Sequence, residues 1–497
     1  MATAPTKKTS LDKDLKKIAA FEQAAHSPSR QQALLYGFLF LVLVLPFTAV
    51  VAGPSPGLFF IMAAGVIGGY MALNIGANDV ANNVGPAVGA RALTMTGALL
   101  MAAVFESAGA LIAGGNVVVT ISKGILDPAL VPDRVTFIWV MMSALLSSAL
   151  WVHLATYFGA PVSTTHSIVG GVLGAGIAAV GTAPINWIVV WSITASWILS
   201  PLIGGVIAAA FLAFIKVNVI YQEDKIAAAR RWVPLLIAFM AAAFSAYLVI
   251  KGLSHVWHPT AGTVAAFAVA VFLGVFLFVR PWVYSQSEGM ENRNQSLRRL
   301  FHFPLICSAA LLSFAHGAND VANAVGPLAA ILHSAEGAPI ANAVNLPFWV
   351  MLIGAAGISL GLFLFGPRIV RRVGEQITRM NPMRAFCVAL SAAFTVIVAS
   401  WLGLPVSSTH VAVGAVFGVG FFREYYTKHS RRRRRFVKKH RLRHIRRKLS
   451  GLDQEEQRRR KLVRRSHFMG IVAAWVITVP AAAVLSAAMF YTVTFFL

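Results

Sequence analysis

Runs of about twenty or more apolar residues recur along most of this chain and constrain its fold more than any other feature. Clear examples cover 34–52, 135–158, 232–250 and 468–497, and about 20 apolar residues are enough for a helix to span the bilayer core. Only 12% of the residues are charged, about half the share usual in soluble domains. These runs exclude a large soluble enzyme, and we predict an all-α polytopic membrane protein with about 12–13 transmembrane segments.

The basic residues are concentrated in one loop. The chain has a net charge of +25, and 20 of its 43 Lys and Arg residues lie within 423–467, between two apolar runs. Basic loops that flank membrane segments are typical of the cytoplasmic side, and they attract anionic lipid headgroups. We therefore expect this loop to contact lipid and expect no nucleic-acid partner. Cys307 and Cys387 lie inside apolar runs, which indicates neither a disulfide nor a metal site.

Two short motifs each occur twice in the sequence. GANDVANNVGP covers 76–86 and returns as GANDVANAVGP at 317–327, while PVSTTH covers 161–166 and returns as PVSSTH at 405–410. The first pair is 241 positions apart and the second pair 244. Such similar offsets over this distance indicate a duplicated unit.

A weaker third pair indicates an insertion in the second copy. Pro201 in SWILSP has Pro480 in AWVITVP as its expected counterpart, at an offset of 279, and the surplus falls where the basic loop lies. We therefore divide the chain into a cytoplasmic polar tail at 1–33, an extra span at 34–56, a first transport repeat at 57–217, a linker with two spans at 218–300, and a second repeat at 301–497 that contains the basic loop 423–467.

Loop charge predicts opposite orientations for the two copies. When basic segments are placed inside, the first GAND motif lies on a span that enters from outside and the second on a span that enters from inside. This is the inverted-repeat arrangement of many secondary transporters. If the segments at Pro161 and Pro405 are re-entrant hairpins, the number of crossings changes.

We expect a multi-pass protein of the plasma (inner) membrane with a cytoplasmic N-terminus. The segments placed inside are 1–33, 216–231, 280–299, 368–384 and 423–467.

The first motif carries the chemistry of a cation site. Asp79 and Asp320 lie in apolar sequence, where an unpaired carboxylate costs several kcal/mol, about 2.5–3.5 on insertion scales. Each could instead cap a broken helix or pair with a buried base. Asparagine oxygens at neighbouring helical positions would complete the ligand set of a hard cation such as sodium, and the flanking Gly and Pro residues are typical of broken helices. The expected coupling residues are Asn78, Asp79, Asn319 and Asp320, and Asn82 and Asn323 lie beside them.

The second motif has the pattern of a helix start. A proline is followed by three hydroxyl residues and then by a Gly-rich apolar stretch. Free backbone N–H groups, the helix dipole and hydroxyl donors together make an anion site, and two such starts approaching from opposite sides would suit a tetrahedral oxyanion. Plain N-capping by Ser163 and Ser407 is the alternative. The predicted substrate-binding hydroxyls are those of Ser163, Thr164, Thr165, Ser407, Ser408 and Thr409.

Four further ionisable residues lie in or beside these motifs. Glu106 is an intramembrane acid, and aligning Gly109 with Gly357 puts Gly354 opposite it. It is either a second coupling residue or a helix-packing partner. His166 and His410 end the hydroxyl motifs, and we rank them below the hydroxyls because a satisfied buried histidine is at least as common. His316 has Ile75 as its counterpart and is a weak indication.

These duplicated motifs resemble those of the inorganic phosphate transporter family. The resemblance covers about 57–217 and 301–497 and implies symport of inorganic phosphate with sodium or protons through a dimer of inverted-repeat protomers. It also implies that the asparagines and aspartates named above serve the cation and the anion pocket, that Asn82 and Asn323 take part in substrate binding, and that the six hydroxyls line the phosphate site. Many family members carry a glutamate in the helix before the second PVS, but 386–390 here reads FCVAL.

The sequence therefore predicts a secondary active transporter that imports inorganic phosphate, not an enzyme, with no cofactor besides the coupling ion. A sulfate or other oxyanion permease is the nearest alternative, because sulfate presents the same tetrahedral shape. An ion channel is less consistent with paired broken-helix motifs. No nucleophile–base arrangement, metal-ligand spacing or nucleotide loop supports a membrane enzyme.

Overall fold

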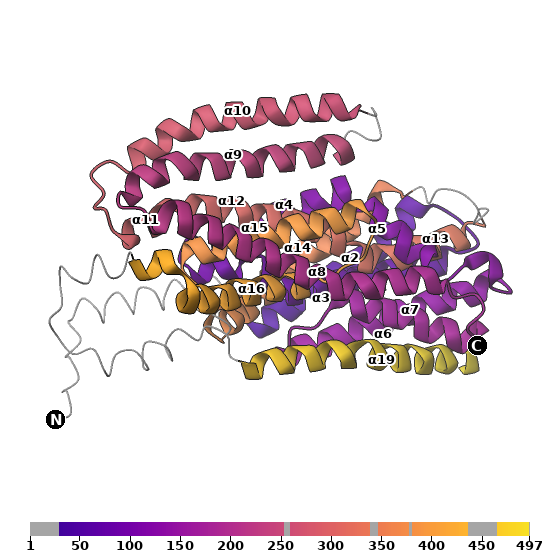
Figure 1. The fold of residues 1–497 in the computed structure, drawn as a ribbon. Coiled ribbons are helices and arrows are strands. Elements are labelled where there is room, and N and C mark those ends of the chain that lie inside the picture. The colour runs from indigo at the N-terminus through magenta and orange to yellow at the C-terminus, as the bar shows by residue number, and fades with distance from the viewer. Residues whose placement is uncertain (1–28, 253–258, 338–345, 377–379, 436–464, 497) are drawn as a thin grey trace.

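The computed structural model describes residues 29–252, 259–337, 346–376, 380–435 and 465–496, which form a bundle of long helices running along a common direction (Figure 1). No strand occurs in these ranges. The α-helices are α2 (Arg30–Ala52), α3 (Leu58–Gly89), α4 (Met95–Ala113), α5 (Gly115–Val119), α6 (Arg134–Phe158), α7 (Thr164–Val180), α8 (Trp187–Ile215), α9 (Lys225–Gly252), α10 (Ala261–Gln286), α11 (Asn294–Leu300), α12 (His302–Asp320), α13 (Ala322–Ala335), α14 (Phe348–Gln376), α15 (Pro382–Trp401), α16 (Ser408–His429) and α19 (Arg465–Phe496). The short helices are η1 (Thr120–Gly124), η2 (Pro128–Leu130) and η3 (Lys216–Ile220).

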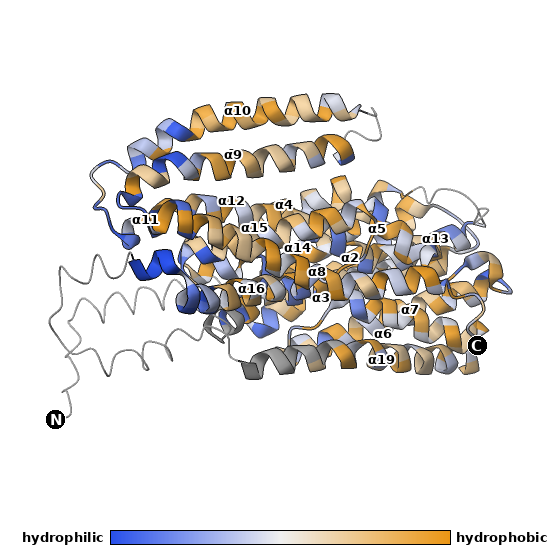
Figure 2. Ribbon diagram, in the orientation of Figure 1, coloured by the Kyte–Doolittle hydropathy of each residue, from blue (hydrophilic) through white to orange (hydrophobic). Residues whose placement is uncertain are grey.

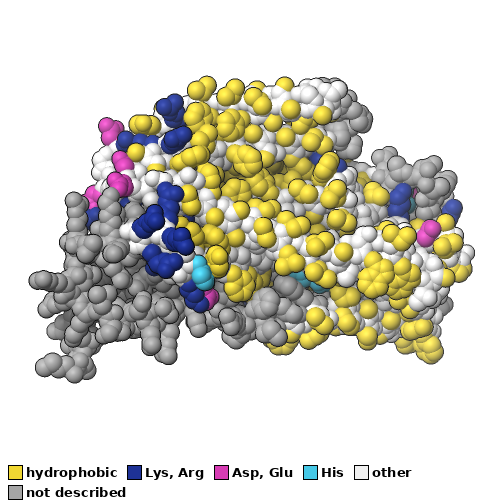
Figure 3. All heavy atoms as spheres, viewed as in Figure 1, with side chains coloured by type: hydrophobic (Ala, Val, Ile, Leu, Met, Phe, Trp, Pro, Cys, Tyr) yellow, Lys and Arg dark blue, Asp and Glu magenta, His cyan; other side chains and the backbone are white. Residues whose placement is uncertain are grey.

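Eleven helices of the described ranges are long and apolar enough to cross a membrane, counting α12 with α13 as one. The apolar α7 is shorter, at 17 residues, and α16 has 22. The predicted all-helical polytopic membrane protein is confirmed, and the chain is an integral, multi-pass membrane protein. Lys and Arg side chains gather at one end of the visible face, whereas hydrophobic side chains cover its middle (Figure 3).

The outer helices are suited to contact with lipid. Only 6% of the apolar window of α10 is buried inside the protein, and Phe278 on this helix is 78% exposed. α10 packs on α9, and the two form an outer layer of the bundle with orange, hydrophobic surfaces along most of their length (Figure 2). Apolar side chains exposed to this extent are stable when hydrocarbon chains surround them.

Helix starts follow capping residues that are visible in the sequence. Ser29, Thr94 and Asn381 each accept a hydrogen bond from a backbone N–H in the first turn of the helix that follows. Asp133 caps α6 by accepting from the backbone N–H of Thr136 at 2.8 Å and from its hydroxyl at 2.6 Å. These hydrogen bonds hold the pKa of the Asp133 carboxyl below its usual value because they favour the ionised form.

The two motif helices run in opposite directions. Gly57, which precedes α3, lies so close to Ala335 at the end of α13 that a Cβ would overlap it. Further along, a Cβ at Gly68 would lie 3.3 Å from the side chain of Leu328. The beginning of α3 therefore meets the end of α13, which is the direction that opposite orientation of the copies requires.

Equivalent helices of the two halves exchange partners. α14 packs along α3 while α4 packs along α12, and α8 packs along α16 while α19 packs along α7. Glycines allow these close approaches. A Cβ at Gly76 would overlap the carbonyl oxygen of Ile358 on α14, and a Cβ at Gly317 would overlap that of Glu106 on α4. Each half thus completes the packing of the other.

These contacts correct two details of the expected repeat register. Because Gly76 faces Ile358 where Gly317 faces Glu106, the counterpart of Glu106 is Ile358 and not Gly354. Gly414 likewise approaches the carbonyl oxygen of Pro201 where Gly170 approaches that of Val479. The counterpart of Pro201 is therefore Val479 and not Pro480. The close approach of the helix backbones defines which residues of the two repeats are equivalent. Matching identical residues in the sequence does not reveal this alignment.

The expected break in the motif helices occurs in one copy. α3 runs without interruption through Gly85 and Pro86, whereas a turn at Val321 separates α12 from α13. In both copies the chain is interrupted instead before α7 and before α16, where the PVS segments lie.

Two expectations concern parts of the chain that are not described here. The polar tail predicted at 1–33 lies outside the described residues up to position 28, and the basic loop predicted at 423–467 lies outside them from 436 to 464.

Candidate functional site

The two hydroxyl motifs form helix N-termini that face each other. Ser163 caps α7 and Ser407 caps α16, and each hydroxyl accepts from the backbone N–H of the histidine three positions on, at 3.1 and 3.3 Å. The rings of His166 and His410 meet edge to face, with centroids 4.4 Å apart. Ser163 and Ser407 therefore act as N-caps, and their part in substrate binding stays a prediction. The convergence itself brings the positive ends of two helix dipoles into one buried place.

The two aspartates lie against these helix starts. Thr164 donates to Asp79 Oδ2 at 3.1 Å, and its counterpart Ser408 donates to Asp320 Oδ2 at 2.9 Å. Thr409 donates to the other oxygen of Asp79 at 2.8 Å. Asp79 therefore accepts one hydroxyl from each half of the protein. Both aspartates are 1% exposed, so these hydrogen bonds replace the water that an ionised carboxylate would otherwise need.

Two asparagines join the halves across the same point. Asn82 Nδ2 donates to Thr409 Oγ1 at 2.8 Å. Its counterpart Asn323 donates to Thr164 and Thr165, both at 3.2 Å. Each asparagine of one half thus binds a hydroxyl residue of the other half's helix start. Thr165 itself donates to the carbonyl oxygen of Val406 at 3.1 Å, and all predicted hydroxyl residues are buried.

The first asparagine of each motif holds the turn before the helix start. Asn78 Nδ2 donates to Thr156 Oγ1 at 2.9 Å and to the Ala160 carbonyl oxygen at 3.3 Å. Asn319 makes the equivalent pair, to Ser400 Oγ at 3.0 Å and the Leu404 carbonyl oxygen at 3.2 Å. The two copies are therefore equivalent down to individual side-chain hydrogen bonds. These bonds hold each turn against its motif helix.

Several buried oxygens around the aspartates have no hydrogen-bond partner within the described ranges. They are Asn78 Oδ1, Asn319 Oδ1, Asp320 Oδ1 and Asn323 Oδ1. A buried acceptor left unpaired is costly, and a neutral or anionic oxygen without a donor is what a hard cation such as sodium binds. The unpaired oxygens of the motif are therefore suitable ligands for a cation.

A buried ionisable network joins α3 and α4 of the first half to α12 of the second half. His316 Nε2 lies 3.0 Å from Asp320 Oδ2 and 3.9 Å from Asp79 Oδ2, and its Nδ1 lies 3.3 Å from Glu106 Oε2. Asn83 donates to Glu106 Oε1 at 2.8 Å. Asp79, His316 and Asp320 each offer a ligand atom within 4.8 Å of the others. Because Ile75 and Ile358 occupy the equivalent positions, the network has an apolar counterpart.

His316 is only a weak indication in the sequence and Asn83 is not singled out there, but both residues contact Glu106 in the structure. The available signal was the spacing of His316 four positions before Asp320, which puts both on one helix face. Glu106 was expected as a coupling residue or a packing partner, and the structure brings it to His316, next to Asp320. Of the predicted coupling residues, Asp79, Asp320 and Glu106 thus lie around His316, whereas Asn78 and Asn319 bind the turns before the helix starts.

Comparisons with known proteins find a matching family, similar sequences and a similar solved structure. The sequence model described as "Phosphate transporter family" matches residues 75–486. A putative phosphate permease of Helicobacter pylori is 50% identical over 425 residues, which covers 84% of this chain and 80% of the relative. One from Pyrococcus abyssi is 34% identical over 426 residues, covering 86% and 96%. A solved structure titled "The sodium-dependent phosphate transporter" has a TM-score of 0.77 at 35% identity and covers 88% of this chain and all of that chain.

Proposed function

This chain belongs to the phosphate transporter family, and we propose that it imports inorganic phosphate by symport with a cation, either sodium or the proton. The observation that carries the proposal is the convergence of two helix starts, one from each half, on a pair of buried aspartates. The membrane-spanning bundle supports a transporter and not an enzyme. The family relationship supports phosphate as the oxyanion.

The hydroxyls explain how the two substrates are coupled. Each of Thr164, Ser408 and Thr409 has one proton, and each donates it to Asp79 or Asp320 in this arrangement. A cation bound between the aspartates offsets part of their negative charge and weakens those hydrogen bonds. The hydroxyls then turn to phosphate oxygens, beside the N-termini of α7 and α16, which also favour an anion. Phosphate therefore binds well only after the cation.

Coupling to a cation also offsets the unfavourable effect of the membrane potential on phosphate entry. An inside-negative potential opposes anion entry by about 2.3 kcal/mol per charge per 100 mV. Cotransported cations cancel that charge. We favour sodium as the coupling ion because unpaired amide and carboxylate oxygens surround the aspartates and because the similar solved structure is titled a sodium-dependent transporter. Proton coupling through the carboxylates is the alternative.

Uptake of labelled phosphate into proteoliposomes tests this function. An imposed sodium gradient is expected to drive saturable uptake, and a proton gradient alone is not. Excess sulfate and arsenate serve as competitors, with arsenate expected to compete and sulfate to compete poorly. If neither gradient drives phosphate and sulfate competes better, the chain is a different oxyanion permease. Flux that rises linearly without saturation would indicate a channel.

Several related properties are also proposals. We propose an inverted-repeat protomer with a cytoplasmic N-terminus, assembled as a homodimer in the plasma (inner) membrane. The opposite directions of α3 and α12–α13 support the inverted repeat. We also propose that the basic segment after α16, at Arg431–Arg435, contacts anionic headgroups. Light scattering of the solubilised protein measures the dimer, and flotation with anionic vesicles, compared with neutral ones, measures the lipid contact.

A further inference from the structure

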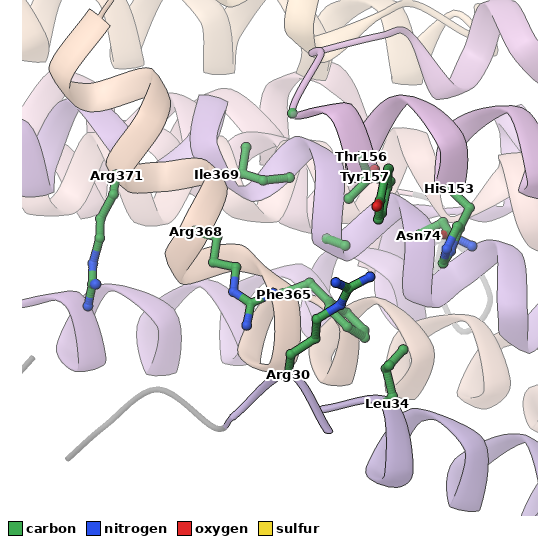
Figure 4. Close-up of a pocket in the computed structure, with 12 residues that line it drawn as sticks. Arg30, Leu34, Asn74, His153, Thr156, Tyr157, Phe365, Arg368, Ile369 and Arg371 are labelled. Carbon is green, nitrogen blue, oxygen red and sulfur yellow. The ribbon is translucent and has the colours of Figure 1, made fainter. Parts of the chain in front are cut away.

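A cavity of about 640 Å³ opens between α2, α3, α6 and α14, away from the paired aspartates. Its charged lining consists of Arg30 from α2 and Arg368 and Arg371 from α14, and no carboxylate of the described ranges lines it. Figure 4 shows Arg30 and Arg368 entering the same space from different helices, with Arg371 at one side of the view and Asn74 and His153 at the other. The cavity is therefore strongly basic.

The charge lies at the mouth and the neutral polar groups lie at the floor. Arg30, Arg368 and Arg371 are exposed, whereas Asn74 and Ala77 are buried. Arg30 is at the first position of α2, and the other two are in the last turns of α14. Loop charge predicts that these helix ends lie on the cytoplasmic side. The cavity thus leads from that side toward the middle of α3.

The floor of the cavity includes residues next to Asn78. Ala77 lines the cavity, and the next two residues of α3 are Asn78 and Asp79. Thr156 also lines it and accepts the 2.9 Å hydrogen bond from Asn78. The side chain of Asn78 therefore binds the cavity wall, one position before Asp79 in α3.

The arginines give the cavity the chemistry of an oxyanion site. A guanidinium binds phosphate oxygens with two parallel N–H donors. Positive groups around a hollow with low-dielectric walls focus the field and raise the local anion concentration. The Arg30 guanidinium lies 5.4 Å from the centre of the Tyr157 ring, which also lines the cavity. This contact holds Arg30 against the cavity wall.

We propose that this cavity is a second oxyanion station, an arginine-lined vestibule through which phosphate passes between the aspartate site and the cytoplasmic side. The inference rests on the proposed function and adds a binding place, and the residues Arg30 and Arg368, to the transport path. The phosphate group of a lipid headgroup has the same chemistry, and the experiment separates the two sources.

The test measures phosphate transport from each side of the membrane, in right-side-out and in inverted vesicles. The double variant Arg30→Gln and Arg368→Gln is expected to raise the half-saturating phosphate concentration on the cytoplasmic side by roughly tenfold, at the low end of field focusing. The half-saturating concentration on the opposite side is expected to stay unchanged. The difference in this concentration between the wild type and the double variant should become smaller at about 1 M salt, where the Debye length falls to about 3 Å.

Matched variants control for folding and for general charge. Arg30→Lys with Arg368→Lys keeps the charge and is expected to retain most of the cytoplasmic-side affinity. Arg280→Gln removes an exposed arginine of α10 that does not line the cavity and is expected to change neither side. Size-exclusion profiles of all variants verify that they are folded.

Three results would overturn the vestibule. They are an equal change on both sides, no change on either side, or an effect that appears only when the vesicles contain anionic lipid, which would assign the cavity to headgroups. These outcomes differ from failure of the proposed function. If the wild-type protein moves no phosphate in either vesicle type, the function itself is wrong. If it transports normally and the arginine variants show no sided effect, only the vestibule is wrong.

Discussion

Asp79 is the side chain on which both halves of the protein converge. It accepts one hydroxyl from Thr164 of its own half and one from Thr409 of the other. Asp320 accepts Ser408 and lies beside His316 instead. The two aspartates thus occupy equivalent positions but have different partners, because the counterparts of His316 and Glu106 are the apolar residues Ile75 and Ile358. Loss of either carboxylate is expected to have unequal consequences.

At this scale we predict that Asp79→Asn lowers the rate of phosphate uptake by about tenfold or more. The change removes the charge that binds the cation and that strengthens two hydrogen bonds, each worth about 1.5–3 kcal/mol when one partner is charged. Uptake into proteoliposomes at a fixed sodium gradient measures it. Asp133→Asn is the matched control, because Asn caps a helix as well as Asp. Equal activity of the Asp79 variant and the control would remove Asp79 from the mechanism.

A second prediction concerns the hydroxyl of Thr409. Thr409→Val removes the acceptor of Asn82 and leaves a buried amide unpaired, at a cost of about 1–3 kcal/mol. We expect a lower midpoint of thermal unfolding and slower uptake. Thr409→Ser keeps the hydroxyl and should restore both. If the valine variant is as stable and as active as wild type, the hydroxyl is not what matters at this position.

At the scale of elements, close helix pairs depend on glycines at their crossing points. Gly76 lies against the backbone of α14 and Gly317 against the backbone of α4. These are backbone contacts, so a rotamer change cannot relieve an added methyl group. Helix α3 also contains Gly85, where a Cβ would meet nothing within 4 Å.

This difference predicts opposite results for two substitutions in one helix. Gly76→Ala is expected to separate α3 from α14 and to destabilise the protein by about 1–3 kcal/mol or more. Gly85→Ala is expected to be neutral or to stabilise the helix by up to about 1 kcal/mol. Thermal unfolding of the two purified variants in detergent compares them. A Gly76→Ala protein as stable as wild type would show that the helices do not pack this closely.

At the scale of the whole molecule, each half supplies helices that cover the other. α19 packs on α7 and α8 packs on α16, so neither half encloses its own helix start. The same exchange brings Asn82 to Thr409 and Asn323 to Thr164. An arrangement in which two antiparallel halves share one buried site suits alternating access.

The orientation of the bundle gives a prediction for labelling. A cysteine at Ala129, in η2, is expected to react with a membrane-impermeant thiol reagent added outside intact cells. A cysteine at Glu288, between α10 and α11, is expected to react only after the membrane is opened. Both positions are exposed, and Cys307 and Cys387 are replaced by serine beforehand. The reverse pattern would invert the predicted topology, and the vestibule would then face outside.

The sequence by itself determined the class of the protein, revealed its duplicated motifs and indicated most residues of the candidate site. Apolar run length depends only on local composition, and the hydroxyl, amide and carboxylate residues lie in two short motifs whose chemistry can be read without a fold. Even the opposite directions of the two motif helices follow from loop charge. These properties are local or additive along the chain.

Only the tertiary structure decided which residues meet. The link between Asn82 and Thr409, the place of His316 between three carboxylates, the register that puts Ile358 opposite Glu106, and the vestibule that joins Arg30 to Arg368 all depend on contacts between helices far apart in sequence. Such contacts depend on how closely two helix backbones approach and on where along each helix they cross. The periodicity and composition of one helix do not specify the position along its length at which it crosses another helix, because that position depends on both helices.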